Sequence, residues 1–179
     1  MRKTCLCLAI ITILLLGLIP CAAAESPLDS YATGSFGNQQ SLAVYTGPGE
    51  EYFRANNGKA AYGGGSARIY GVAGDWIMIG YGLSNGNYRF GYISADALPN
   101  SALHIPYLNL RYTTAQVKTD ATLTDDIART RTTLVEVPAG TYVLLLGYTN
   151  EIGIRWAYIE LLINNSIMRG FIPASALTQ

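Results

Sequence analysis

One eight-residue motif occurs twice in this chain, 79 residues apart, and it limits the possible folds more than any other feature. The first copy, residues 91–98, reads GYISADAL, and the second copy, residues 170–177, reads GFIPASAL. A tryptophan-containing segment precedes each copy, at Trp76 and at Trp156. Self-similarity at a fixed spacing is typical of a duplicated structural unit. The sequence therefore predicts two tandem units of one fold.

Each unit is expected to consist of short β-strands. Gly, Asn, Pro and Thr interrupt the apolar runs after Glu25, and no long helical periodicity is present. The pairs Asn85-Gly86 and Asn164-Asn165 tolerate the positive φ of tight hairpin turns. We therefore predict an all-β chain, with one unit at residues 31–98 and the other at residues 104–179.

Residues 1–24 have the layout of an export signal. Two basic residues precede an apolar run over residues 5–19, and three alanines follow at residues 22–24. The run is shorter than the ~20 apolar residues of a membrane-spanning helix. We expect cleavage before Glu25, a secreted or extracellular product associated with the cell envelope, and no membrane contact after cleavage. The alternative is a lipid on Cys21, which the preceding proline disfavours.

The composition of the mature chain excludes several functions. Without residues 1–24, 10 basic residues face 12 acidic ones, which leaves no basic surface for nucleic acid. All three cysteines lie in the signal, and His104 is the only histidine. A catalytic triad, a disulfide or a zinc site is therefore not supported. We expect no enzyme activity, no cofactor and no metal.

One catalytic alternative remains, because carboxylates alone can hydrolyse some bonds. The candidates are Asp125 with Asp126, Glu50 with Glu51, and Asp75. Adjacent acids in loops are more often solvated turn residues, so a carboxylate-dependent hydrolase is the least favoured function.

The first copy opens with a motif of its own. Residues 42–49 read LAVYTGPG and are followed by Tyr52. With the tryptophan strand, the hairpin and the Gly-aromatic-aliphatic tail, this order of parts resembles the bacterial SH3-like (SH3b) family over residues 40–98. The second copy, residues 115–177, keeps the tryptophan and the tail but lacks the Gly-Pro turn. The resemblance implies two tandem small SH3-like β-barrels that bind cell-wall peptides, namely those of peptidoglycan.

The residues expected to bind a ligand are aromatic. Strand alternation places Trp76 and Met78 on one face, and the charged Glu160 beside Trp156 suggests that this face is partly wet. The predicted groove consists of Tyr45, Tyr52, Trp76, Tyr88 and Tyr92. The alternative is that these rings close the end of a small barrel or cover the interface between the two copies.

The segment between the copies, residues 99–114, is too apolar for a free linker, so we expect it to be buried between the units. Two functions remain open for the whole chain. It is either a non-catalytic envelope module that recognises peptidoglycan peptides, or a module that binds another secreted or surface protein by strand addition at an open sheet edge.

Overall fold

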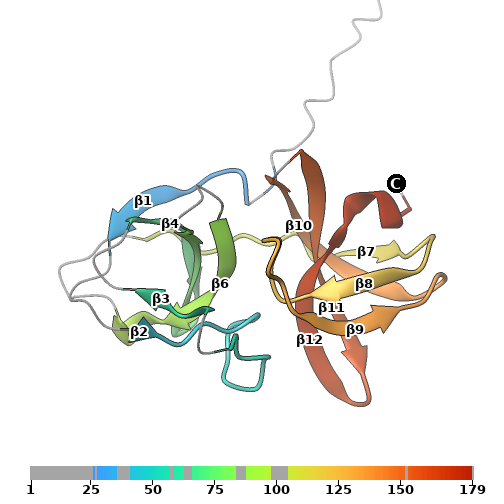
Figure 1. Cartoon of the computed structure of the whole chain (residues 1–179), viewed down its shortest axis with the longest axis horizontal. Coiled ribbons are helices and arrows are strands. Elements are labelled where there is room, and N and C mark those ends of the chain that lie inside the picture. Colours follow the sequence, from blue (N-terminus) through green and yellow to red (C-terminus); the bar gives the residue numbers. More distant parts are fainter. Residues whose placement is uncertain are drawn as a thin grey trace, which may run out of the picture.

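The chain forms two lobes joined by an extended connector (Figure 1). In this computed structural model the described residues are 26, 28–35, 41–56, 59–62, 66–83, 88–97, 105–151 and 153–178. The predicted export signal, the Asn85-Gly86 turn and His104 lie outside these residues.

Unit 1 contains a four-stranded antiparallel sheet and a two-stranded ribbon. Its elements are β1 (Ala32–Ser35), β2 (Ser41–Leu42), β3 (Ala61–Tyr62), β4 (Ser66–Ala73), β5 (Trp76–Gly82), β6 (Tyr88–Ser94) and the short 3-10 helix η2 (Ala95–Ala97). The sheet has the order β1-β4-β5-β6, and the ribbon pairs β2 with β3.

Unit 2 contains one six-stranded sheet. Its elements are β7 (Thr113–Gln116), β8 (Ala121–Thr124), β9 (Thr133–Val137), β10 (Tyr142–Glu151), β11 (Ile154–Ile163), β12 (Ser166–Pro173) and the 3-10 helix η3 (Ala174–Ala176). The order is β7-β10-β11-β12-β8-β9. The all-β prediction is confirmed. Among the described residues, the first and last strands of each sheet are not paired with each other, so neither sheet closes on itself. Edge strands such as β7 and β9 pair on one side only.

The duplication seen in the sequence is repeated in the backbone. Tyr45 bridges to Tyr92 in unit 1, and Thr124 pairs with Phe171 in unit 2, at the same spacing of 79 residues as the two tail motifs. Gly91 and Gly170, which precede Tyr92 and Phe171, allow the two segments to approach closely at this pairing. A Cβ on Gly170 would lie 2.5 Å from the carbonyl oxygen of Thr124, so only glycine fits without movement.

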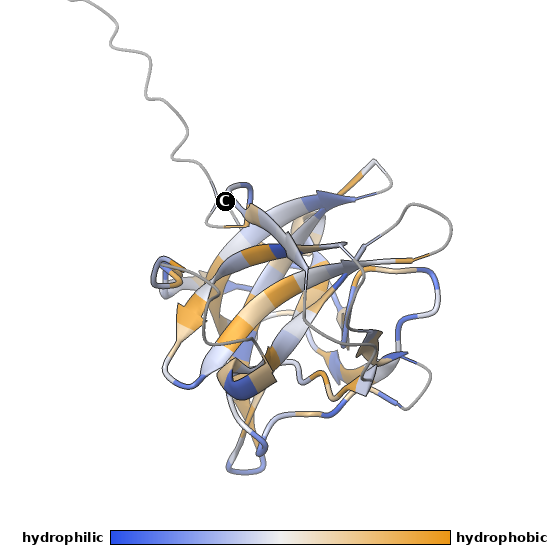
Figure 2. Ribbon diagram, turned by 90° about the vertical axis from the view of Figure 1, so that its left-hand side faces the viewer, coloured by the Kyte–Doolittle hydropathy of each residue, from blue (hydrophilic) through white to orange (hydrophobic). Residues whose placement is uncertain are grey.

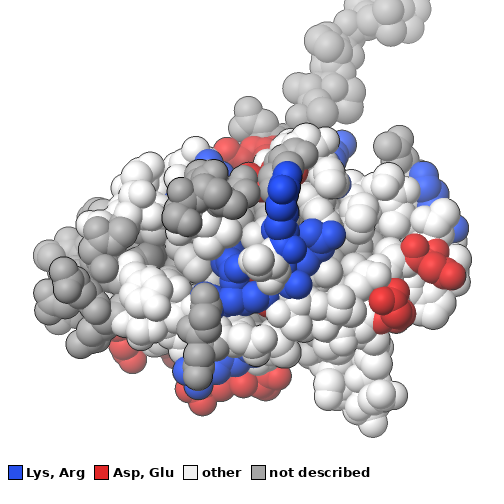
Figure 3. All heavy atoms as spheres, viewed as in Figure 1, with Lys and Arg blue, Asp and Glu red and all other residues white. Residues whose placement is uncertain are grey.

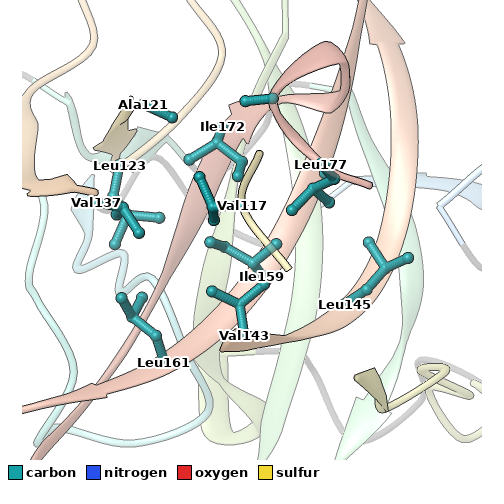
Figure 4. Close-up of a cluster of buried hydrophobic side chains, with 12 residues drawn as sticks. Val117, Ala121, Leu123, Val137, Val143, Leu145, Ile159, Leu161, Ile172 and Leu177 are labelled. Atoms are coloured by element: carbon teal, nitrogen blue, oxygen red, sulfur yellow. The ribbon is translucent and has the colours of Figure 1, made fainter. Parts of the chain in front are cut away.

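Each unit has its own apolar core, formed by the inward positions of its strands. Hydrophobic positions lie along the strands, and many loop positions are hydrophilic (Figure 2). Unit 1 buries Val44, Ala61, Ala67, Ile69, Ile77, Ile79, Tyr81 and Ile93. Unit 2 buries a larger set that includes Val117, Leu123, Val143, Ile159, Leu161 and Ile172 (Figure 4). Burial of such side chains is the main force that holds each unit together.

A third apolar cluster joins the two units. It consists of Leu28, Tyr70, Met78, Phe90, Tyr92, Leu110, Ile127, Leu146, Trp156, Tyr158 and Phe171. The rings of Phe90 and Phe171 meet across the junction at 5.5 Å between centroids. The strand face that carries the tryptophan in each unit is thus packed against the other unit.

The connector runs along both units. Leu108 donates its N–H to the carbonyl of Val72 at 2.8 Å, and Arg111 donates its N–H to the carbonyl of Leu146 at 3.0 Å. Leu110 is buried, whereas Tyr107 is 87% exposed. Among residues 105–112 only Leu110 is buried, and the rings of both Tyr107 and Tyr112 are exposed. This segment is therefore hydrogen-bonded to both units but is not buried between them as predicted. Residues 98–104 lie outside the described part of the chain.

Candidate functional site

The structure places the five predicted aromatic residues in four different surroundings. Tyr45 and Trp76 are both half-buried and meet edge to face, with ring centroids 5.1 Å apart. Tyr92 is completely buried in the cluster between the units. Tyr88, at the other end of β6, stacks on the guanidinium of Arg68 at 3.6 Å.

Tyr52, the fifth predicted residue, faces the second unit. The guanidinium of Arg169 lies 5.5 Å from its ring centroid, and burial raises the pKa of its phenol. Arg169 also donates from Nε to Glu160 at 2.6 Å. The groove expected from the sequence is therefore divided: one aromatic pair stays at the surface of unit 1, and the other rings serve other contacts.

The turn that opens each unit contacts the other unit. The hydroxyl of Tyr158 donates to the carbonyl of Thr46 at 2.6 Å, at the start of the Gly-Pro turn. Burial raises the pKa of Tyr92 to about 12 and that of Tyr158 well above its usual value, so both phenols are neutral at neutral pH. The turn between the predicted groove residues Tyr45 and Tyr52 is thus contacted by the second unit.

The corresponding turn of unit 2 carries charge. Lys59 of unit 1 lies 2.6 Å from Asp125 and 3.6 Å from Asp126, and Arg89 lies 3.7 Å from Asp126. All four side chains are nearly buried. Desolvation, and then the charge of Asp125, raise the pKa of Asp126. These contacts occupy the paired carboxylates that the sequence offered as catalytic candidates.

Glu50, Glu51 and Asp75, the other candidate acids, are exposed. Within the described ranges no three His, Cys, Asp or Glu residues are grouped so as to hold a metal ion.

A hollow of about 470 Å³ opens on unit 2, at the positions that correspond to the predicted groove of unit 1. Thr124 lies there where unit 1 has Tyr45, since both pair with the aromatic residue of the tail motif. The smaller side chain leaves open the space that the Tyr45 ring takes against Trp76 in unit 1. The lining comprises Thr119, Asp120, Ala121, Thr122, Thr124, Arg131, Thr133, Glu136, Trp156, Pro173, Ser175 and Ala176.

The hollow combines one cation, two carboxylates and an aromatic ring. The guanidinium of Arg131 lies 5.2 Å from the ring centroid of Trp156, which is 3% exposed. Glu136 accepts from the hydroxyl of Thr122 at 3.0 Å, and one Asp120 oxygen accepts the N–H of Ala139. Each carboxylate keeps acceptor capacity for a ligand. The arrangement suits a small molecule that carries charges of both signs.

Sequence reasoning did not select Arg131, Glu136 or Asp120, because it looked for aromatic residues beside the Gly-Pro motif. A signal was present in the repeat. Tyr52 and Arg131 occupy equivalent places, since Thr46 bonds to Phe53 and Asp125 bonds to Thr132 in the same way. Aligning the two copies residue by residue would have shown a polar set in the second one.

On the face shown in Figure 3, Lys and Arg side chains gather between the two lobes. Among the residues that the structure describes, no helix is long and apolar enough to cross a membrane.

Comparisons with known proteins give little further information. No family model matches the chain, and no curated protein matches it. A solved structure described as "Structure of NlpC2 from Trichomonas vaginalis" is similar at a TM-score of 0.32 and 19% identity, over 84% of this chain and 48% of that one. This chain therefore spans about half the length of that protein.

Proposed function

We propose that this chain is an exported, non-catalytic binding module of the cell envelope that holds peptides of peptidoglycan in the hollow of unit 2. The export-like residues 1–24 support the location, and the SH3-like resemblance of the repeat supports the ligand class. The observation that carries the proposal is the lining of the hollow, where Arg131 covers Trp156 and the carboxylates of Glu136 and Asp120 lie nearby.

The chemistry of this lining matches short peptides with free ends. A guanidinium binds a carboxylate through two parallel hydrogen bonds, and a carboxylate binds an ammonium group. Arg131 supplies the first group, and Glu136 and Asp120 supply the second. Trp156 is buried beneath Arg131, and the half-buried Pro173 offers an apolar contact for the aliphatic part of the peptide. Binding of this kind requires neither a metal nor a cofactor.

The test is retention of the mature chain on purified cell-wall sacculi. Arg131→Ala and Glu136→Gln should each reduce retention about 10-fold, because each removes one charge-assisted contact. Arg129→Ala is the matched control, since Arg129 is exposed in the same turn but does not line the hollow. No retention of the parent, or equal retention of the parent and both variants, would contradict the proposal.

One observation favours a second candidate, the binding of another exported protein. A mainly apolar groove of about 340 Å³ adjoins the edge strand β7, and Tyr142, Leu162 and Ile167 are exposed beside it at 70%, 66% and 49%. An open strand edge with apolar side chains suits strand addition. Capture of one defined polypeptide from a secreted-protein extract, lost in Leu162→Ser, would favour this candidate over the wall peptide.

A further inference from the structure

The segment that carries Arg131 is a closed turn between β8 and β9. Asp125 and Thr132 close it, since the N–H of Asp125 donates to the carbonyl of Thr132 at 3.0 Å and the N–H of Thr132 donates to Asp125 Oδ1 at 2.6 Å. Inside it, the N–H of Ala128 donates to Asp126 Oδ1 at 2.7 Å. The turn therefore moves as one piece, and Arg131 moves with it.

Unit 1 holds this turn on both sides of Arg131. Arg89 donates from Nη2 to the hydroxyl of Thr130, the residue before Arg131. Lys59 donates from Nζ to the hydroxyl of Thr132, the residue after it, at 2.7 Å. Lys59 and Arg89 are 8% and 5% exposed. Two buried cations of unit 1 thus fix the backbone from which a side chain of unit 2 reaches the hollow.

Lys59, which contacts the turn from unit 1, is itself hydrogen-bonded within unit 1. The hydroxyl of Tyr81, in the core of unit 1, donates to the carbonyl of Lys59, and the N–H of Lys59 donates to the carbonyl of Asn56 at 2.7 Å. These bonds fix the backbone of Lys59, from which its ammonium reaches the turn. We take unit 1 as the support and the turn of unit 2 as the part that is positioned.

We infer that Lys59 and Arg89 are positioning residues for ligand binding: they place Arg131 over Trp156, so that the hollow of unit 2 selects a free carboxylate only when unit 1 is docked. This inference rests on the proposed function of the hollow. It assigns selectivity to a contact between units, because a guanidinium must be well placed to form two bonds with a carboxylate. An undocked turn would leave Arg131 without a defined place above the ring.

The experiment measures selectivity rather than affinity alone. The probes are a synthetic wall tripeptide of alanine, γ-linked glutamate and lysine, and the same peptide with its C-terminal carboxylate amidated. The mature chain is titrated with both, and the ratio of the two Kd values is recorded. The Kd of the parent should be about 10-fold lower for the peptide with the free carboxylate, which is the effect expected of one charge-assisted hydrogen bond. Arg131→Ala should bring the ratio near one.

Two variants test the positioning role. Thr130→Val keeps the volume of the side chain and removes the bond from Arg89, whereas Lys59→Met removes the stronger anchor. Both should lower the ratio about threefold or more, toward that of Arg131→Ala, because a misplaced guanidinium loses its contact with the carboxylate. Thr113→Val, an exposed threonine of β7 outside the hollow, is the matched control and should keep the parent ratio.

The outcomes separate the two proposals. A parent that binds neither peptide would overturn the proposed function and the inference with it. A parent whose preference is lost in Arg131→Ala but kept in folded Thr130→Val and in Lys59→Met would overturn only the inference. If Lys59→Met does not fold, Thr130→Val alone decides, since Thr130 is an exposed residue and the ratio is independent of overall affinity.

Discussion

Unit 1 and unit 2 use equivalent positions for opposite purposes. At the first position, Tyr45 fills the surface beside Trp76, whereas Thr124 leaves a hollow beside Trp156. At a second position, Tyr52 packs under Arg169 of the sister unit, whereas Arg131 lies over the tryptophan of its own unit. The copy that carries the Gly-Pro turn is therefore the one in which a ring fills the space beside the tryptophan. A motif kept after duplication can serve the contact between copies instead of ligand binding.

The two opening turns also meet the other unit with different chemistry. The turn of unit 1 offers the carbonyl of Thr46 to a neutral phenol, while the hydroxyl of Thr46 is buried with no hydrogen-bond partner. The turn of unit 2 offers two carboxylates to two buried cations. Loss of one partner from a buried ion cluster leaves an uncompensated charge, so the unit 2 side should be far more sensitive to substitution.

The largest effect is expected at Asp125. Asp125→Ala leaves the buried Lys59 ammonium without its nearest carboxylate and should lower the free energy of unfolding by about 3–5 kcal/mol. Urea denaturation of the mature chain measures the change. A loss below about 1 kcal/mol would show that the cluster is more hydrated than the burial of its side chains indicates.

Gly170 should give the next largest effect. Gly170→Ala places a Cβ 2.5 Å from a backbone oxygen and should cost about 1–3 kcal/mol by overpacking. Gly82→Ala is the matched control, because a Cβ there meets nothing within 4 Å. Thermal unfolding followed by circular dichroism compares the two variants. Equal melting temperatures would mean that strand β8 can move away from β12 at little cost.

A smaller effect is expected where unit 1 is made to resemble unit 2. Tyr45→Thr removes the edge-to-face contact with Trp76, which is worth about 0.5–1.5 kcal/mol beyond burial. Retention on sacculi should remain at the parent level, because the hollow of unit 2 is untouched. A large loss of retention with an intact fold would return the binding site to unit 1.

Thr46 occupies the place in unit 1 that Asp125 occupies in unit 2, and it should respond least. Thr46→Val keeps the shape and removes a buried hydroxyl that has no partner, so stability should change by less than about 0.5 kcal/mol or rise. The measurement is the same urea titration as for Asp125→Ala. A loss above about 1 kcal/mol would mean that the hydroxyl has a partner, such as a buried water.

The pH dependence of stability gives a further test of the charged turn of unit 2. Because the pKa of Asp126 is raised above 3.8, the folded chain takes up this proton before the unfolded chain does. The stability of the parent relative to Asp126→Asn should therefore rise as pH falls through the raised pKa, and level off below about 3.8. Unfolding titrations across acidic pH give the difference. An opposite slope would show that the pairing with Lys59 and Arg89 outweighs desolvation.

Local sequence patterns were enough to predict the strands and several residues on which turns and close contacts depend. The tail glycines were recognised from the repeat, and Gly170 is required by a contact within its own unit. Asn164 and Asn165 adopt positive φ of 49° and 63° at the predicted hairpin turn. Alternation also placed Trp76 and Met78 on one face correctly, since their strand partners Ser94 and Tyr92 lie two residues apart. These features depend on neighbours close in sequence or one strand away.

The sequence by itself determined the duplication, the all-β class and the face on which each side chain lies, because strand periodicity and turn chemistry are local properties. Only the tertiary structure decided what covers those faces. Glu160 suggested a wet surface, yet its carboxylate is paired with Arg169 beside the junction of the units. The hollow of unit 2 likewise depends on Arg131 being held from residues far away in the chain. Alternation assigns a side chain to a face, but the partner of that face is set by packing between distant segments.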